Sequence, residues 1–124
     1  MEKIYTDKAP AAIGPYSQAI KVGKLIFTSG QIPIDPKTGN IDASDIEAQT
    51  EQVCKNLTAV LEAAGSSPNS VVKTTCYLSD MADFAAFNAI YAKHFPSCPA
   101  RSCIAVKALP KGSLVEVEVI AETE

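Results

Sequence analysis

The sequence has few of the residues that build common catalytic and metal centres. His94 is the only histidine, and the four cysteines include no C-x-x-C pair. A zinc site needs closely spaced thiol and imidazole ligands, and a serine or cysteine nucleophile needs a base beside it. No nucleophile elbow, P-loop or dinucleotide-binding glycine motif occurs. We therefore predict no metal and no cofactor, and we expect buried or partly buried thiols.

Basic clusters and long apolar runs are also missing. Lysines and arginines are scattered singly, and the net charge is -3, which disfavours nucleic acid or an anionic membrane as a partner. No stretch approaches the roughly 20 apolar residues that span a bilayer, and the N-terminus lacks the pattern of a signal peptide. The sequence therefore predicts a cytoplasmic protein without nucleic-acid or membrane partners.

What is present is typical of one globular domain. The 124 residues are 47% apolar and 20% charged, without repeats or linkers, so we expect a single domain over residues 1–124. Apolar periodicity and turn residues predict the order strand, strand, strand, helix, strand, helix, strand, strand. The predicted strands are 4–6, 17–22, 25–29, 71–78, 102–106 and 114–121, and the predicted helices run from a Ser44–Glu47 capping box to Gly65 and from Asp80 or Asp83 to Pro96.

These elements predict an α+β fold with a single mixed sheet and two helices packed on one face. Two helices cover about 20 Å, whereas five or six strands span about 24–29 Å on each face. The last strand would turn Val115 and Val117 toward the helices and Glu116 and Ile120 away from them. The second face therefore fits a subunit interface, and a solvated antiparallel face is the alternative.

Arg101 and Glu116 are the first candidates for chemistry. Arg101 lies at a strand start in an otherwise uncharged segment, where its planar fork suits a carboxylate; a structural ion pair is the alternative. Glu116 lies within the last strand, where it could hold a water or accept its proton, or be an ordinary solvated residue. His94 ends the second helix, which suits a C-terminal cation or a packing residue.

Three further candidates lie near the end of the third strand and in the turn before the second. Gly30 would allow close backbone approach and offer a free N–H, and Ser29 precedes it. Tyr16 follows Gly14-Pro15 and could border a ligand or pack in the core.

Several segments in the same order resemble the RidA (YjgF-like) family. They are Ala11-Ala12-Ile13-Gly14-Pro15-Tyr16-Ser17-Gln18, Thr28-Ser29-Gly30-Gln31-Ile32-Pro33, Pro99-Ala100-Arg101-Ser102-Cys103, Leu109-Pro110 and Val115-Glu116-Val117-Glu118. Val117 is a mild departure from the family pattern. The resemblance implies a chorismate-mutase-like fold and a homotrimer with a central barrel and sites at the subunit interfaces.

The resemblance also implies an activity, which is the hydrolytic deamination of 2-iminobutanoate and 2-iminopropanoate to 2-oxo acids and ammonia. By resemblance, Arg101 binds the substrate carboxylate with help from Ser29 and Gly30. Tyr16 borders the pocket from a neighbouring subunit, and Glu116 and the Cys103 carbonyl position the water.

Other functions associated with the fold or the family are a chaperone-like (holdase) role, small-ligand-binding regulation, and RNA cleavage or translation inhibition. The acidic balance and single histidine weigh against RNA cleavage. A chorismate mutase would need several cations in its pocket, whereas the suspected site has only Arg101.

Overall fold

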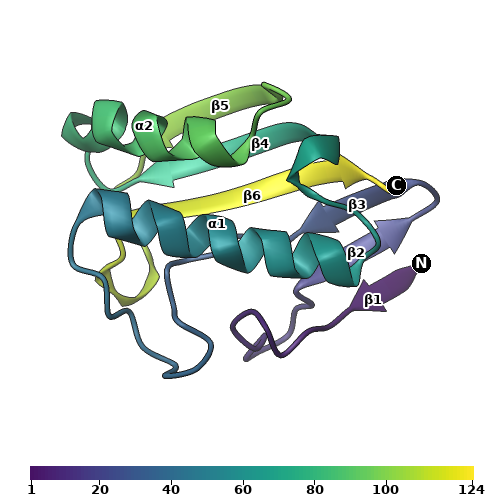
Figure 1. Ribbon diagram of the computed structural model, residues 1–124. Coiled ribbons are helices and arrows are strands. Elements are labelled where there is room, and N and C mark those ends of the chain that lie inside the picture. Colours follow the sequence, from purple (N-terminus) through teal and green to yellow (C-terminus); the bar gives the residue numbers. More distant parts are fainter.

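A six-stranded mixed sheet carries both long helices on one face, as the computed structural model of residues 1–124 shows (Figure 1). The sheet order is β1-β2-β3-β6-β4-β5. The strands are β1 (Glu2–Ile4), β2 (Ala19–Val22), β3 (Leu25–Thr28), β4 (Val71–Leu78), β5 (Ala100–Ala105) and β6 (Val115–Glu122). The helices are α1 (Ile46–Ala63) and α2 (Phe84–His94), with short 3-10 turns η1 (Pro68–Ser70), η2 (Met81–Asp83) and η3 (Pro110–Gly112). The predicted fold class is confirmed.

The strand directions follow from short turns and long crossovers. Gly23 has φ 59° in the two-residue β2–β3 turn, and Lys24 has negative φ, as a type II′ hairpin requires. α2 connects β4 to β5, which pair in parallel. α1 connects β3 to β4, which are both antiparallel to β6 between them. Both helices therefore cross between parallel strands, as predicted.

The ends of α1 agree with the sequence at the C-terminus and differ at the N-terminus. Ser44 was expected to cap the helix, but the N-cap is Asp45, whose carboxylate accepts the Ala48 N–H at 2.7 Å. An aspartate satisfies a free amide as well as a serine does, so sequence alone did not separate the two neighbours. Gly65 has φ 82°, and the Gly65 and Ser66 amides donate to Glu62 and Leu61. This is a Schellman end, which favours glycine.

Both aspartates proposed to cap the second helix precede it, in different roles. Asp80 accepts the Ala82 N–H at 2.9 Å and so starts η2, which leads directly into α2. Asp83 makes no side-chain capping bond. The chain therefore enters α2 through a tighter turn, which apolar spacing does not distinguish from an α-helix.

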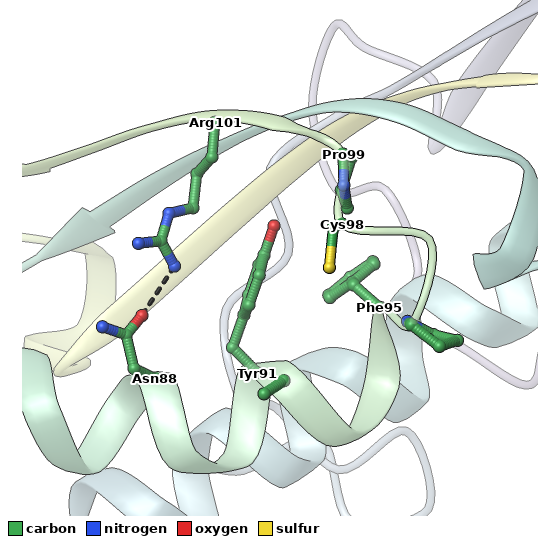
Figure 2. Close-up of a pocket in the computed structure, with 8 residues that line it drawn as sticks. Asn88, Tyr91, Phe95, Cys98, Pro99 and Arg101 are labelled. Atoms are coloured by element: carbon green, nitrogen blue, oxygen red, sulfur yellow. Dashed lines mark hydrogen bonds between the residues drawn. The ribbon is translucent and has the colours of Figure 1, made fainter.

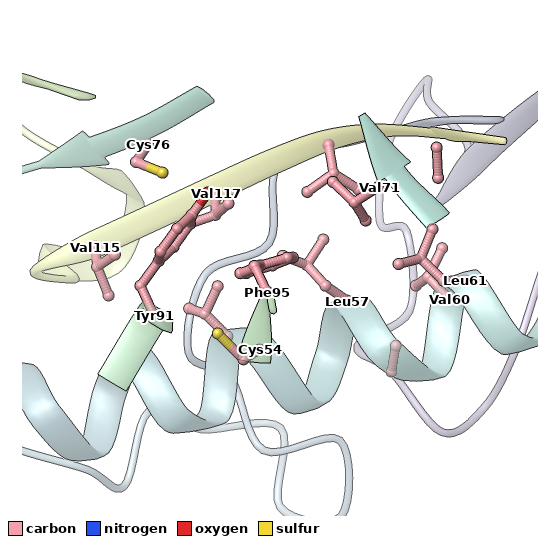
Figure 3. Packing of buried hydrophobic residues seen from close by; sticks show 14 of the residues in the cluster. Cys54, Leu57, Val60, Leu61, Val71, Cys76, Tyr91, Phe95, Val115 and Val117 are labelled. Carbon is pink, nitrogen blue, oxygen red and sulfur yellow. The ribbon is translucent and has the colours of Figure 1, made fainter. Parts of the chain in front are cut away.

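The hydrophobic core lies between α1, α2 and the sheet (Figure 3). Alternation along β6 turns Val115, Val117, Val119 and Ala121 into this core, and all four are buried. Neither α1 nor α2 has the length and apolar composition of a membrane-spanning segment.

No helix of this chain covers the opposite face of the sheet. Phe27 in β3 pairs in register with Ile120 in β6, and the Phe27 side chain is 41% exposed. Leu25 and Ile104 on the same face are also exposed. Exposed apolar side chains of this size on the open face are compatible with the predicted interface, which stays a prediction.

Candidate functional site

Arg101 lies on the helix-covered face of edge strand β5 and extends toward α2 (Figure 2). Its guanidinium carbon lies 4.9 Å from the Tyr91 ring centroid and 5.4 Å from that of Phe84. Its Nη1 donates to the Asn88 side-chain oxygen at 2.6 Å. Two aromatic faces and one amide therefore hold the cation in place.

No acidic side chain pairs with Arg101. The one ion pair in the chain joins His94 and Glu51 at 2.9 Å, so the alternative interpretation of Arg101 as a structural ion pair is wrong. The guanidinium has five N–H donors, and Asn88 accepts one of them. A partly buried arginine without a counter-charge is well suited to an anionic ligand.

Sequence reasoning missed the role of Asn88. Phe84, Asn88 and Tyr91 follow the i, i+4, i+7 spacing, so they share one face of α2. That spacing could have placed the amide beside the two rings. Only the tertiary packing shows that this face lies under Arg101.

The backbone of β5 presents free polar groups at the sheet edge. The Val106 N–H donates to Leu78 of β4 at 2.9 Å, and no strand pairs with the other side of β5. Backbone groups of alternate residues in a parallel strand point to opposite sides. The N–H and C=O of Arg101 and Cys103 therefore point outward. The Cys103 side chain packs against the core, and burial raises the pKa of its thiol.

Glu116 lies on the open face and leans against Gly30. A Cβ on Gly30 would overlap the Glu116 carboxylate and fall 2.9 Å from its Cδ. Gly30 was expected to allow a ligand close approach; in the structure the Glu116 carboxylate makes that close approach. The glycine and the glutamate thus form one unit, although they lie 86 positions apart in the sequence.

The surroundings of Glu116 favour its protonated form. Burial, and secondarily the Glu118 carboxylate, raises the pKa of Glu116 above its ordinary value. The Tyr77 hydroxyl donates to Glu118 at 2.7 Å, and this bond and burial raise the pKa of Tyr77 to about 12. Glu118 is thus held by Tyr77, while Glu116 has no side-chain hydrogen bond. A carboxylate of this kind is better suited to accepting a proton than an ordinary exposed one.

Gly30 adjoins Glu116, Ser29 precedes Gly30 in the chain, and Tyr16 shares a pocket with Gly30. The Ser29 hydroxyl donates to the Ser17 carbonyl at 2.6 Å, so its proton is already in use. The Gly30 N–H has no acceptor within the chain and is available to a ligand. Tyr16 is 53% exposed and lines a pocket of about 560 Å³ together with Gly30.

The candidate residues therefore form two groups. The Arg101 group consists of Arg101, Asn88 and Cys103, and the Glu116 group consists of Tyr16, Ser29, Gly30 and Glu116. In register, Arg101 pairs with buried Thr74 on the helix-covered face, whereas Glu116 pairs with Tyr77 on the open face. One chain does not bring the two groups into one pocket.

The remaining sulfur and imidazole side chains are accounted for individually. Cys54 and Cys76 are buried, as expected, but Cys98 is exposed and has φ 52° in the turn that follows Pro96. No three His, Cys, Asp or Glu side chains cluster as metal ligands. His94, expected as a helix C-terminal cation or packing residue, ends α2 and contacts Glu51 of α1.

Known proteins resemble this chain over nearly its whole length. Residues 6–123 match the family described as Endoribonuclease L-PSP. A RutC family protein of Pyrococcus horikoshii is 56% identical, covering 99% of this chain and 98% of its own. Reactive Intermediate Deaminase A of Arabidopsis thaliana is 52% identical over 97% of this chain and 65% of its own. The structure of E. coli TdcF with bound serine superposes with a TM-score of 0.95 at 40% identity, covering 100% of both chains.

Proposed function

Because this chain belongs to the Endoribonuclease L-PSP (RidA) family, we propose that it hydrolyses small 2-imino acids to 2-oxo acids and ammonia. 2-Iminobutanoate and 2-iminopropanoate are the proposed substrates. The name of the Arabidopsis relative supports a deaminase role, and the serine bound to E. coli TdcF supports a small acid as ligand.

The observation that carries the proposal is the unpaired guanidinium of Arg101. A small carboxylate would complete its hydrogen bonding, because two donors of the fork match two carboxylate oxygens. Phe84 and Tyr91 hold the guanidinium in place when no ligand is bound. The free Gly30 N–H would add one donor, and Ser29 would fix the strand end that presents it.

The reaction needs no covalent nucleophile, because an imine carbon is already electrophilic. Water would add its oxygen to C2 and a proton to the imine nitrogen, giving a carbinolamine. The hydroxyl proton of the carbinolamine would then pass to its amino group, so that the C–N bond breaks, ammonia leaves and the carbonyl forms. Glu116 would accept and return the protons, and the Cys103 carbonyl would help to place the water.

Each site would lie between two copies of the chain. The Arg101 group and the Glu116 group face different ways in one copy, so a site with both draws them from neighbours, with Tyr16 at the border. The apolar open face supports a homotrimer in which three sheets pack around a central barrel. Three equivalent interfaces would give three sites.

The test couples the protein to threonine dehydratase and follows the decay of the imine. The Arg101→Lys variant keeps the charge but loses the fork, and charge-assisted hydrogen bonds contribute about 1.5–3 kcal/mol each. We expect kcat/KM to fall about 10- to 150-fold. Normal turnover by this variant would remove Arg101 from its role.

Glu116→Ala is the companion variant. We expect it to bind 2-oxobutanoate nearly as well as the wild type in calorimetry, while its turnover falls much further. Wild-type protein that binds 2-oxobutanoate without turning over the imine would point instead to a small-ligand-binding regulatory protein.

A further inference from the structure

The orientation of Arg101 depends on a buried hydrogen bond behind the ring on which it rests. The Tyr91 hydroxyl and Thr74 Oγ1 lie 2.7 Å apart. Thr74 is completely buried, and Tyr91 is 8% exposed. Thr74 is also the β4 residue that pairs in register with Arg101. The strand that supports the Arg101 backbone thus also fixes the far end of its aromatic support.

The Tyr91 ring is held along its whole length. Its Cα belongs to α2, its hydroxyl is tied to β4, and two aromatic rings of the same helix segment lie beside it in tilted orientations. The ring centroids of Phe87 and Phe95 lie 5.5 and 4.6 Å away. In Figure 2 the ring stands upright between Arg101 and the segment of Cys98 and Pro99, with its hydroxyl toward the sheet. The ring therefore has little freedom to tilt.

Stability alone gives little reason for this polar pair. Replacing both partners of a buried hydrogen bond with apolar groups of the same shape is often nearly neutral. Phenylalanine and valine would fill the same space. What the hydroxyl pair adds is a fixed direction for the ring, and hence for the plane of the guanidinium stacked on it at 4.9 Å.

We propose that Thr74 and Tyr91 are positioning residues that hold the Arg101 fork in the plane needed for a carboxylate. This inference rests on the proposed function, since it assumes that Arg101 grips a small acid. Asn88 fixes one N–H of the fork, and Tyr91 fixes its plane. A bidentate contact depends on both, because its two hydrogen bonds must form together.

The experiment compares Tyr91→Phe, Thr74→Val, the double variant and Thr74→Ser. The two single variants should raise KM for the imine and the Kd for 2-oxobutanoate about 5- to 10-fold, with kcat within about two-fold. The double variant should recover the thermal stability that the singles lose, since no buried hydroxyl is left unpaired, yet keep the raised KM. Thr74→Ser keeps the hydroxyl and should retain a normal KM.

A matched control is Leu61→Ala, which truncates a buried side chain of α1 that lies away from Tyr91 in Figure 3. It should lower thermal stability without raising KM. A double variant whose KM returns to normal along with its stability would show that the pair is only structural, and the positioning role would be overturned. So would singles with unchanged KM and Kd.

The two proposals fail in different ways. Wild-type protein that neither binds 2-oxobutanoate nor consumes the imine would overturn the proposed function, and the positioning role with it. Wild-type protein that binds 2-oxobutanoate and consumes the imine, together with an Arg101→Lys variant that is impaired in both, would keep the function. In that case unchanged binding by Tyr91→Phe would remove only the positioning role.

Discussion

At Gly30 the missing side chain leaves room for another residue's carboxylate. The backbone there is not in the left-handed region, so conformational freedom is not what calls for glycine. The Glu116 carboxylate occupies the space where a Cβ would lie. A steric requirement of this kind can be tested with a single methyl group.

Gly30→Ala should push the flexible Glu116 side chain aside, and we expect turnover to fall at least about ten-fold with little loss of stability. In a Glu116→Ala background the same substitution should have almost no further effect, because the overlap is gone. The measurement is a double-mutant cycle on kcat/KM. Additive losses would contradict the steric coupling.

The raised pKa of Glu116 predicts a pH dependence. If its carboxylate form accepts the proton, kcat/KM falls as pH falls through this raised pKa, above the roughly 4.3 of an ordinary glutamate. Glu118→Gln removes the secondary cause, so the acid limb should move to lower pH, but only part of the way because burial is the larger cause. The control is Glu122→Gln, which removes a charge of the same strand that does not contribute to the shift. If the acid limb of the pH profile lay at the same pH in Glu118→Gln and Glu122→Gln, the contribution of Glu118 to the raised pKa of Glu116 would be contradicted.

Sequence reasoning found most single residues of the candidate site but not their partners. Arg101 stood out because its segment is otherwise uncharged, and Glu116 because it interrupts valines. The contacts of Arg101 with Asn88 and Tyr91, and of Tyr91 with Thr74, depend on how α2 packs under β4 and β5, and no local pattern encodes that packing.

At the scale of elements, the N-terminus of α1 shows where local patterns end. Ser44 and Asp45 are both good N-caps, and the structure uses the second. Asp45→Ala should therefore lower the free energy of unfolding by about 1 kcal/mol, whereas Ser44→Ala should leave it nearly unchanged. Chemical denaturation of the two variants decides between them. A larger loss of unfolding free energy in Ser44→Ala than in Asp45→Ala would show that Ser44 caps the helix.

The elements themselves were largely predictable. The strand Val71–Leu78 was predicted with its observed ends, because apolar alternation and flanking polar residues bound it closely. β5 begins two residues earlier than predicted, since pairing with β4 draws Ala100 and Arg101 into the sheet. Tertiary pairing, not local propensity, sets such an end.

For the whole molecule, the placement of the two groups on opposite faces leads to a complementation test. Arg101→Ala and Glu116→Ala should each be nearly inactive alone. Unfolded together and refolded as mixed assemblies, about a quarter of the sites would receive both intact groups from different copies. We expect activity to return to about that fraction.

The control for this experiment is to mix the two folded variants without denaturation, so that subunits do not exchange and activity stays low. No recovery after refolding would place both groups of a site within one chain. The uncovered face was predicted from the sequence by comparing the width of two helices with that of the sheet. That the Arg101 group and the Glu116 group lie on different faces follows only from the strand register.

The cysteines also decide how the protein can be labelled. Burial raises the pKa of Cys76 to about 12 and that of Cys54 still further, so neither forms the thiolate that a maleimide attacks. Cys98 is exposed and lines the same groove as Arg101. A fluorophore could be attached to Cys98 without engineering a new cysteine. It would lie beside the guanidinium, and its emission would change when an acid binds or dissociates.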